Sequence, residues 1–197
     1  MMIAVIDYKM GNIRSLGHAL QRLGAEWRLT ADTDEIAKAS HVILPGVGNA
    51  AEAMANLDRL RLPATILKIR RPVLGICVGM QVMCRHTEEG DAHCMGIFDA
   101  KVRRFREIPE RGIKVPNMGW SPLGNMESKL FNDIRSGEYV YFVHSYYAPT
   151  CPDTIATSRH PELFSAALKY ENFFGCQFHP EKSGEVGERI LENFLKI

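Results

Sequence analysis

A cysteine between two glycines is the feature of this sequence most able to do chemistry. Cys77 lies in residues 73–81 (VLGICVGMQ), where an apolar strand is expected to turn into a helix. That order is typical of a nucleophile elbow, with sulfur in place of the serine hydroxyl. Gly75 would let the strand approach its neighbours, and Gly79 would let the chain turn sharply around the sulfur. A helix N-terminus there would favour the reactive thiolate.

A histidine and a carboxylate follow much later, in residues 177–181 (QFHPE). On an extended segment, side chains two positions apart point to the same side, so His179 and Glu181 are expected to face one way. With Cys77 they supply a nucleophile, a base and a group that orients the base. A lone cysteine is more often an inert buried thiol, but the flanking glycines and the His-x-Glu pair favour a catalytic one.

Residues 41–48 (HVILPGVG) read as a short buried strand that runs into a glycine loop. Such loops can present backbone N–H groups to a developing negative charge, although Pro-Gly-x-Gly is by itself an ordinary turn signal. Beside an elbow, the loop could complete an oxyanion hole. His144 and Ser145 are not expected to form a second catalytic pair, because adjacent strand residues face opposite sides.

These motifs resemble those of the class I, triad-type glutamine amidotransferases. Residues 7–12 (DYKMGN), 115–120 (VPNMGW) and 141–147 (YFVHSYY) are further similar to the glutaminase subunits of imidazole glycerol phosphate synthase. The resemblance implies a heterodimer in which this chain hydrolyses L-glutamine through a cysteine thioester and passes ammonia to a barrel-shaped cyclase subunit. The cyclase would then make imidazole glycerol phosphate and an aminoimidazole carboxamide ribotide in histidine biosynthesis.

The resemblance assigns roles position by position. It implies Cys77 as nucleophile, His179 as general base and acid, and Glu181 as the orienting carboxylate. It implies oxyanion donors at the backbone N–H groups of Val78 and, after a loop rearrangement, Val47. The substrate contacts that it implies are Gly46, Gly48, Gln81, Ser145 and Tyr146, and the residues that it places at the partner interface are Asn12, Trp120 and Lys182. It implies no cofactor.

Two residues depart from the family pattern. Asn117 stands where a histidine is common, and Ser121 where an asparagine is common, both in an expected loop around Trp120. The resemblance implies that this loop faces the partner, and the enrichment of Trp at binding hot spots agrees with it. The alternative is that Trp120 packs beneath a long connection.

Other functions share parts of this pattern. A glutaminase of vitamin B6, purine, anthranilate, nucleotide-sugar or surface-sugar synthesis would have the same triad. A catalytically silent docking module is the non-enzymatic alternative, and the intact triad argues against it. A thiol redox protein is disfavoured, because the sequence has no Cys-x-x-Cys pair.

The bulk properties fit a cytoplasmic enzyme subunit. The chain has 197 residues, 46% of them hydrophobic, which can bury one sizeable core, so a single domain over 1–197 is expected. Lys and Arg total 24 against 23 Asp and Glu, and a net charge of +1 gives no field for nucleic acid. No stretch has the length and hydropathy of a membrane span, and the first residues lack a signal-peptide pattern.

The cysteine pattern predicts neither disulfides nor a metal centre. Five cysteines without dense spacing fit a reducing compartment, and Cys84, Cys151 and Cys176 are expected as buried thiols. Cys84 and Cys94 lie near His86 and His93, but these four lack the paired spacing of a structural zinc site. Residues 86–93 are expected to form a polar loop.

The elements that must position these residues follow an α/β pattern. Strands are expected at 3–7, 26–29, 41–44 and 73–76, the last two nearly all apolar as in a sheet covered on both faces. Helices are expected from residue 13, with Asn12 as a possible cap, over 49–60, near 64–70 and from 185 to the end. This alternation predicts an open, mainly parallel central sheet flanked by helices.

Beyond Gly96 successive strands replace this alternation. They are expected at 101–106, 139–143, 154–157, 164–169 and 173–177, and should pair largely antiparallel. The elbow and the His-x-Glu segment each follow a strand. Both should therefore lie at the carboxyl edge of the sheet, where folds of this kind bind ligands.

Overall fold

A seven-stranded sheet of order β11-β12-β13-β4-β3-β1-β2 lies at the centre of the molecule, in a computed structural model that describes residues 2–197. Its parallel part consists of β1 (Met2–Ile6), β2 (Glu26–Thr30), β3 (His41–Leu44), β4 (Val73–Ile76) and β13 (Phe173–Cys176). An antiparallel edge follows, of β12 (Leu163–Tyr170) and β11 (Thr154–Arg159). The predicted α/β class is confirmed.

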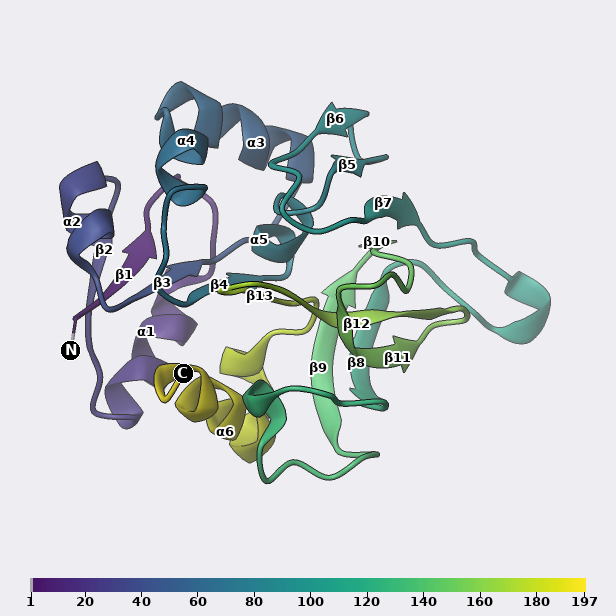
Figure 1. Cartoon of the computed structure of the whole chain (residues 1–197). Helices are drawn as coiled ribbons and strands as arrows, with labels where there is room; N and C mark the ends of the chain where they lie inside the picture. The colour runs from purple at the N-terminus through teal and green to yellow at the C-terminus, as the bar shows by residue number, and fades with distance from the viewer. Residues whose placement is uncertain (1) are drawn as a thin grey trace.

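Helices cover both faces of this sheet (Figure 1). On one side lie α1 (Ile13–Arg22) and α6 (Gly184–Leu195), and on the other lie α3 (Ala50–Arg59), α4 (Leu62–Ile66) and α5 (Val78–Gln81). Asn12 caps α1, as expected, by accepting the Ser15 N–H through its side chain. The helix α2 (Thr33–Lys38) was not predicted, because its six residues bury one apolar side chain, Ile36, and show no periodicity.

Two small sheets lie beside the antiparallel edge. One contains β10 (Tyr146–Tyr147), β7 (Lys101–Arg104), β5 (His86–Thr87) and β6 (Ala92–His93). The other pairs β8 (Asn117–Pro122) with β9 (Tyr139–His144). Within residues 2–197, three short 3-10 turns complete the elements: η1 (Pro109–Arg111), η2 (Lys129–Phe131) and η3 (Pro180–Lys182).

Two predicted loops are therefore wrong. The loop predicted around Trp120 is β8, whose six residues pair antiparallel with β9 from Asn117 to Pro122. Glycine and proline within it look like loop residues, but a two-stranded ribbon tolerates them. The loop predicted at 86–93 contains the β5–β6 hairpin, with strands too short to show any alternation.

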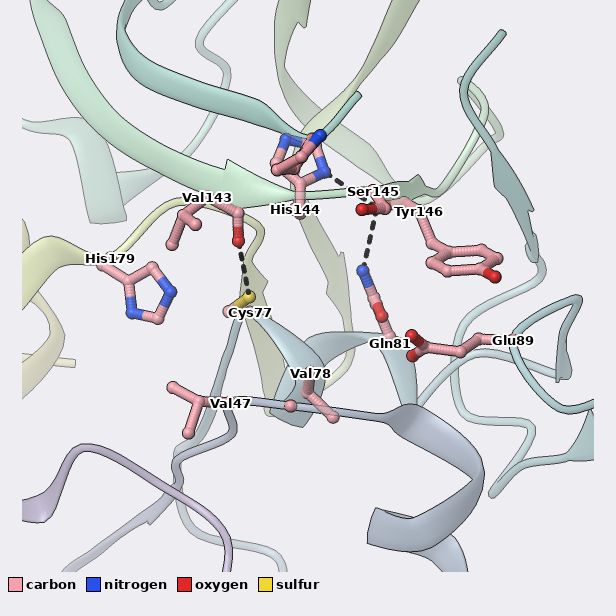
Figure 2. Close-up of a pocket in the computed structure, with 12 residues that line it drawn as sticks. Val47, Cys77, Val78, Gln81, Glu89, Val143, His144, Ser145, Tyr146 and His179 are labelled. Atoms are coloured by element: carbon pink, nitrogen blue, oxygen red, sulfur yellow. Dashed lines mark hydrogen bonds between the residues drawn. The ribbon is translucent and has the colours of Figure 1, made fainter. Parts of the chain in front are cut away.

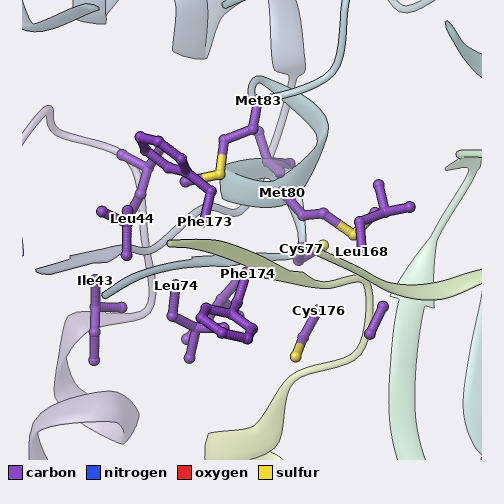
Figure 3. Close-up of a cluster of buried hydrophobic side chains, with 14 of the residues drawn as sticks. Ile43, Leu44, Leu74, Cys77, Met80, Met83, Leu168, Phe173, Phe174 and Cys176 are labelled. Atoms are coloured by element: carbon purple, nitrogen blue, oxygen red, sulfur yellow. The ribbon is translucent and has the colours of Figure 1, made fainter. Parts of the chain in front are cut away.

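The central strands are buried over their whole length. β3, β4 and β13 are buried at all four positions, which fits their apolar sequences. In Figure 3, Phe173 and Met83 lie on one face of these strands and Phe174 and Leu74 on the other. Both chemistry-bearing segments follow directly from two of these strands, β4 and β13, so they start from the buried interior of the sheet.

No helix within residues 2–197 combines the length and the hydropathy that crossing a membrane requires.

Candidate active site

Cys77 occupies the sharp turn between β4 and α5. Its backbone has φ 53° and ψ −109°, a region that costs a non-glycine residue free energy and that is found mainly at functional sites. Its N–H donates to the Cys176 carbonyl at 2.7 Å, which ties the turn to β13. Its carbonyl accepts from Met80 and Gln81, which starts α5. This is the strand-to-helix turn that the sequence predicts.

The two glycines that flank Cys77 are required because other backbone atoms approach them too closely to leave room for a Cβ. A Cβ on Gly79 would lie 1.9 Å from the Leu44 carbonyl oxygen, and one on Gly75 would lie 2.7 Å from the Gly79 carbonyl. The sequence predicted that Gly79 relieves the turn itself, but the residue in the left-handed region is Cys77. Gly79 instead lets α5 pack directly on the end of β3.

His179 and Glu181 form a buried pair. His179 Nδ1 lies 2.8 Å from Glu181 Oε1, and because a carboxylate accepts, Nδ1 donates. The side chains are 1% and 3% exposed. The contact does not arise on an extended segment, as predicted, but at the start of η3, where Pro180 fixes φ and begins a 3-10 turn.

The second nitrogen of His179 is the one available for chemistry. Its Nε2 is buried and finds no hydrogen-bond partner in the described chain. Burial opposes the imidazolium, but the nearby Cys77 sulfur and the hydrogen-bonded Glu181 carboxylate outweigh it and raise the pKa of His179 above its ordinary value. His179 and Cys77 also line one cavity.

A cavity of about 280 Å³ opens beside the sulfur (Figure 2). In this view Cys77 and His179 lie at one end, and Gln81, Tyr146 and Glu89 at the other. Its size suits a small polar ligand, near the lower limit of typical ligand pockets. The predicted site residues in its wall are Val47, Gly48, Cys77, Val78, Gln81, Ser145, Tyr146 and His179.

Of the residues predicted to act in catalysis or to contact substrate, Gly46 and Glu181 lie outside this wall. Glu181 lies behind His179, as an orienting group should. Gly46, predicted to contact substrate, packs instead against the elbow, where a Cβ on it would lie 2.4 Å from the Gly79 nitrogen. The glycine at 46 thus brings the loop after β3 into backbone contact with α5.

Gln81 is held by the protein through its amide nitrogen. Nε2 donates to the Tyr146 carbonyl at 2.9 Å and to Gln177 Oε1 at 3.0 Å. Both N–H groups are therefore engaged. The carbonyl oxygen of Gln81 is the polar atom left for a ligand.

Four residues of the cavity wall were not predicted as site residues: Glu89, Pro116, Val143 and His144. Glu89 is the one among them with a charged side chain. It lies on the turn between β5 and β6, and its Oε2 accepts the Ala50 N–H at 2.6 Å, at the first residue of α3. Burial raises the pKa of the Glu89 carboxyl, and the Ala50 bond opposes that shift. In Figure 2 its carboxylate points toward Gln81. In the sequence it is one of several acidic residues in a polar stretch, and nothing distinguishes it.

Asn117 is a buried residue rather than a partner-facing one. Its Nδ2 lies 3.1 Å from His144 Nε2, and His144 Nδ1 lies 2.7 Å from the Tyr146 carbonyl. Because a carbonyl only accepts, Nδ1 carries the proton and Nε2 accepts from Asn117. Burial lowers the pKa of His144 to about 3, so this imidazole is neutral and helps fix the Tyr146 carbonyl.

Two of the residues predicted at the partner interface, Trp120 and Lys182, lie at the β8–β9 ribbon. Trp120 is 54% exposed, and its ring meets Tyr141 edge-on at 6.0 Å between centroids. Lys182 Nζ lies 6.0 Å from the centroid of the same tyrosine. Trp120 is therefore not packed beneath a connection. We call Trp120, Tyr141 and Lys182 the aromatic cluster.

Asn12 lies near the rear of the triad. With His179, Glu181 and residues of the loop after β3, it lines a cavity of about 10 Å³. That volume is about one water molecule in size. A space for about one water thus lies between the rear of the base and the segment that joins β1 to α1.

Cys84, His86, His93 and Cys94, which the sequence brought into question as metal ligands, do not form a metal site. Within residues 2–197, no three His, Cys, Asp or Glu side chains are placed to hold an ion. His86 instead bonds to Asp91 at 2.9 Å. All five cysteines are free; Cys84 and Cys176 are buried as predicted, whereas Cys151 is partly exposed, because it lies in the turn before β11.

Sequence comparison gives a family and full-length relatives. A family model described as glutamine amidotransferase class-I matches residues 4–197. The chain is 50% identical over 198 residues to imidazole glycerol phosphate synthase subunit HisH of Bacteroides thetaiotaomicron, covering 100% of both chains. It is 41% identical over 197 residues to the protein of the same name in Idiomarina loihiensis, covering 100% of this chain and 98% of that one.

Solved structures share the fold. A glutamine amidotransferase crystal structure matches with a TM-score of 0.75 at 15% identity, over 98% of this chain and 97% of that one. A PurLQS structure from Thermotoga maritima matches with a TM-score of 0.73 at 20% identity, over 99% of this chain and 97% of that one.

Proposed function

Because this chain belongs to the class-I glutamine amidotransferases, we infer that its cavity is a glutaminase site and that the chain is a subunit of imidazole glycerol phosphate synthase. It hydrolyses L-glutamine to glutamate and ammonia, and the ammonia serves the synthesis of imidazole glycerol phosphate in histidine biosynthesis. One observation carries the chemistry. A strained cysteine and a carboxylate-bound histidine, far apart in sequence, line a single cavity.

The reaction proceeds through a thioester at Cys77. The thiolate attacks the side-chain amide carbon of glutamine, and the tetrahedral oxyanion forms. His179 protonates the nitrogen, the C–N bond breaks, and ammonia leaves. His179 then takes a proton from water, which attacks the thioester and breaks the C–S bond, giving glutamate and the regenerated thiol. Glu181 holds the imidazole in the orientation that this exchange needs.

We assign the oxyanion donors to two backbone N–H groups. Val78 is the first residue of α5, where N–H groups have no partner within the helix and the helix dipole favours negative charge. Val47 lines the cavity from the loop after β3 and lies beside Val78 in Figure 2. Its N–H joins the site after the loop rearranges, and the Tyr8 hydroxyl, which donates to the Pro45 carbonyl, anchors the start of that loop.

The polar end of the cavity orients the amino acid. Glu89 and the carbonyl oxygen of Gln81 are acceptors suited to the substrate ammonium group. Ser145 and the backbone of Gly48 provide donors for its carboxylate. This arrangement directs the side-chain amide toward Cys77 and selects an amino acid over a simple amide.

We propose that the partner is a barrel-shaped cyclase bound as a heterodimer at the aromatic cluster. An exposed Trp backed by Tyr and Lys suits a binding hot spot. The water-sized cavity between the triad and Asn12 supports an exit for ammonia beside Asn12. Five free cysteines support a reducing, cytoplasmic setting.

The test is a Cys77→Ser variant assayed in complex with the candidate cyclase and its phosphorylated substrate. We expect glutamine-dependent turnover to fall at least about a thousandfold, while turnover with ammonium salts persists, because the nucleophile is lost and docking is not. Cys94→Ser, a thiol outside the cavity, is the matched control and should retain both activities. Full glutaminase activity in Cys77→Ser would refute the mechanism.

The same complex tests the coupling. Glutamine hydrolysis is measured with and without the cyclase and its substrate, and we expect it to rise when both are present. Equal turnover in the two conditions would show that the cyclase does not activate this site, and the chain would then be a simple glutaminase.

A further inference from the structure

Gln177 is a buried polar residue to which the glutaminase mechanism gives no task. It follows β13, directly before the Phe178-His179 segment, and its side chain is fully inaccessible. A buried amide is costly unless its donors and acceptors are satisfied. Its partners therefore reveal what it does.

Gln177 contacts the nucleophile. Its Nε2 lies 3.6 Å from Cys77 Sγ, as an N–H donor to sulfur. Its Oε1 accepts from Gln81 Nε2 at 3.0 Å. The amide thus bridges the sulfur and the residue at the polar end of the cavity.

The orientation of this amide is set by a backbone carbonyl. The Tyr146 carbonyl can only accept, so the Gln81 atom that faces it, 2.9 Å away, is the nitrogen. That nitrogen also donates to Gln177, so the Gln177 atom facing it is the oxygen Oε1. The Gln177 nitrogen Nε2 therefore points at the sulfur. Turning the Gln177 amide around would break its hydrogen bonds to Gln81 and to Cys77.

One neighbour of the sulfur favours the thiol form of Cys77, and another favours the thiolate. The Val143 carbonyl lies 3.9 Å from Cys77 Sγ and can bond to the thiol, because a thiol donates and a thiolate does not (Figure 2). The Gln177 N–H favours the thiolate, since a charged acceptor forms the stronger hydrogen bond. A donor fixed in this way acts in every protonation state of His179.

We propose that Gln177 is a fixed hydrogen-bond donor that stabilises the thiolate of Cys77, held in register by Gln81 and the Tyr146 carbonyl. The inference rests on the proposed function only in taking Cys77 as the nucleophile. His179 and Glu181 after β13, Tyr8 after β1 and the neutral His144 at the end of β9 are the other titratable groups around the sulfur. None of them is a hydrogen-bond partner of the Gln177 side chain, whose partners are Gln81 and Cys77.

The experiment uses Gln177→Met, which keeps the length of the side chain and removes the donor. The full chain is alkylated with iodoacetamide from pH 5 to pH 9, and mass spectrometry of peptides gives the rate at each cysteine. We expect the pH midpoint for alkylation at Cys77 to rise by about one unit, with alkylation about tenfold slower below the midpoint, as loss of one charge-assisted hydrogen bond predicts. Alkylation at Cys94 in the same sample is the internal control and should not change.

A second variant guards against misfolding. Gln177→Asn keeps an amide but withdraws it by one methylene, and it should move the midpoint in the same direction while the variant retains the wild-type circular dichroism. An unmoved midpoint at Cys77 in both variants, whatever the loss of turnover, would overturn the proposal and leave Gln177 a packing residue. Because alkylation needs no glutamine turnover, failure of the glutaminase assignment would be seen separately.

Discussion

The chemistry of Cys77 depends on the hydrogen-bond donors and acceptors that surround its sulfur. His179 is held by Glu181 with its second nitrogen unpartnered, Gln177 donates to the sulfur, and the Val143 carbonyl accepts from it. Positive φ at the cysteine keeps the sulfur at the cavity wall. A free thiol in an ordinary turn would have none of these contacts. The expected reactivity of Cys77 therefore comes from the groups placed around its sulfur.

The carboxylate of Glu89 should control substrate affinity. Replacing it in Glu89→Gln removes the charge that faces the ammonium group, and we expect KM for glutamine to rise about tenfold to a hundredfold, from the value of a charged hydrogen bond, with little change in kcat. Steady-state kinetics in the cyclase complex measure both constants. Glu88→Gln is the matched control, because Glu88 is an exposed neighbour that also accepts a backbone N–H, that of Arg104 at 2.8 Å. Equal effects of the two changes would contradict this role.

The neutral imidazole of His144 should make the fold sensitive to acid. Its pKa falls from 6.5 to about 3 on folding through burial, so below pH 6.5 the unfolded chain binds a proton that the native chain refuses. The free energy of unfolding contributed by this residue is therefore complete above pH 6.5 and decreases as the pH falls toward 3. Relative to His144→Gln, wild type should lose about 1.4 kcal/mol per pH unit in urea titrations between pH 6 and pH 4. Parallel pH curves for the two proteins would show that the prediction is wrong.

At the scale of elements, the elbow works because three backbone segments touch. The end of β3, the loop after it and the first turn of α5 approach at distances that exclude a Cβ on Gly46, Gly75 or Gly79. The first-turn N–H groups of α5 are thereby placed beside the cavity. Without the glycines, the sulfur and its oxyanion donors could not share one wall.

Gly79→Ala should therefore disturb the site through the backbone. The added Cβ would lie 1.9 Å from the Leu44 carbonyl oxygen, so the end of β3 must shift, and we expect a loss of about 1–3 kcal/mol in the free energy of unfolding. Glutaminase turnover should fall as well. Gly124→Ala is the control, because its Cβ would meet an ordinary contact at 3.5 Å, and it should cost less than about 0.5 kcal/mol. Equal urea midpoints for both variants would contradict the packing argument.

At the scale of the whole molecule, the β8–β9 ribbon joins the cavity to the proposed docking face. The cavity lies at the carboxyl ends of β4 and β13 and is also lined by Val143 and His144 of β9, while the same ribbon carries Trp120 and Tyr141 of the aromatic cluster. The triad stands between them, since His179 N–H donates to the Tyr141 carbonyl at 2.9 Å. A partner that binds the cluster would thus contact the strand that supports the base.

Trp120→Ala tests the docking face. Because Trp120 is exposed, its removal should leave the free energy of unfolding within about 0.5 kcal/mol of wild type, yet weaken binding to the candidate cyclase at least about tenfold. Titration calorimetry measures the affinity. Tyr170→Ala removes an aromatic ring that is 49% exposed at the end of β12, and it should leave affinity unchanged. An unaltered affinity in Trp120→Ala would place the partner elsewhere.

The sequence by itself determined the fold class, the family and the identities of the proposed triad. These are local signals: nearly all-apolar strands predict a sheet covered on both faces, and glycines around Cys77 predict a strand-to-helix turn whatever the rest of the chain does. The resemblance added the roles of His179 and Glu181. The predicted extent of a single domain over 1–197 stays a prediction.

Tertiary structure alone decided what surrounds the triad. Glu89 reaches the cavity because the β5–β6 hairpin packs against the start of α3, and Gln177 meets the sulfur because β13 pairs in register with β4. Asn117 turns inward because β8 pairs with β9, although its neighbours read as a loop. Each of these contacts joins segments distant in sequence, and a residue pattern carries no information about which distant backbone it will meet.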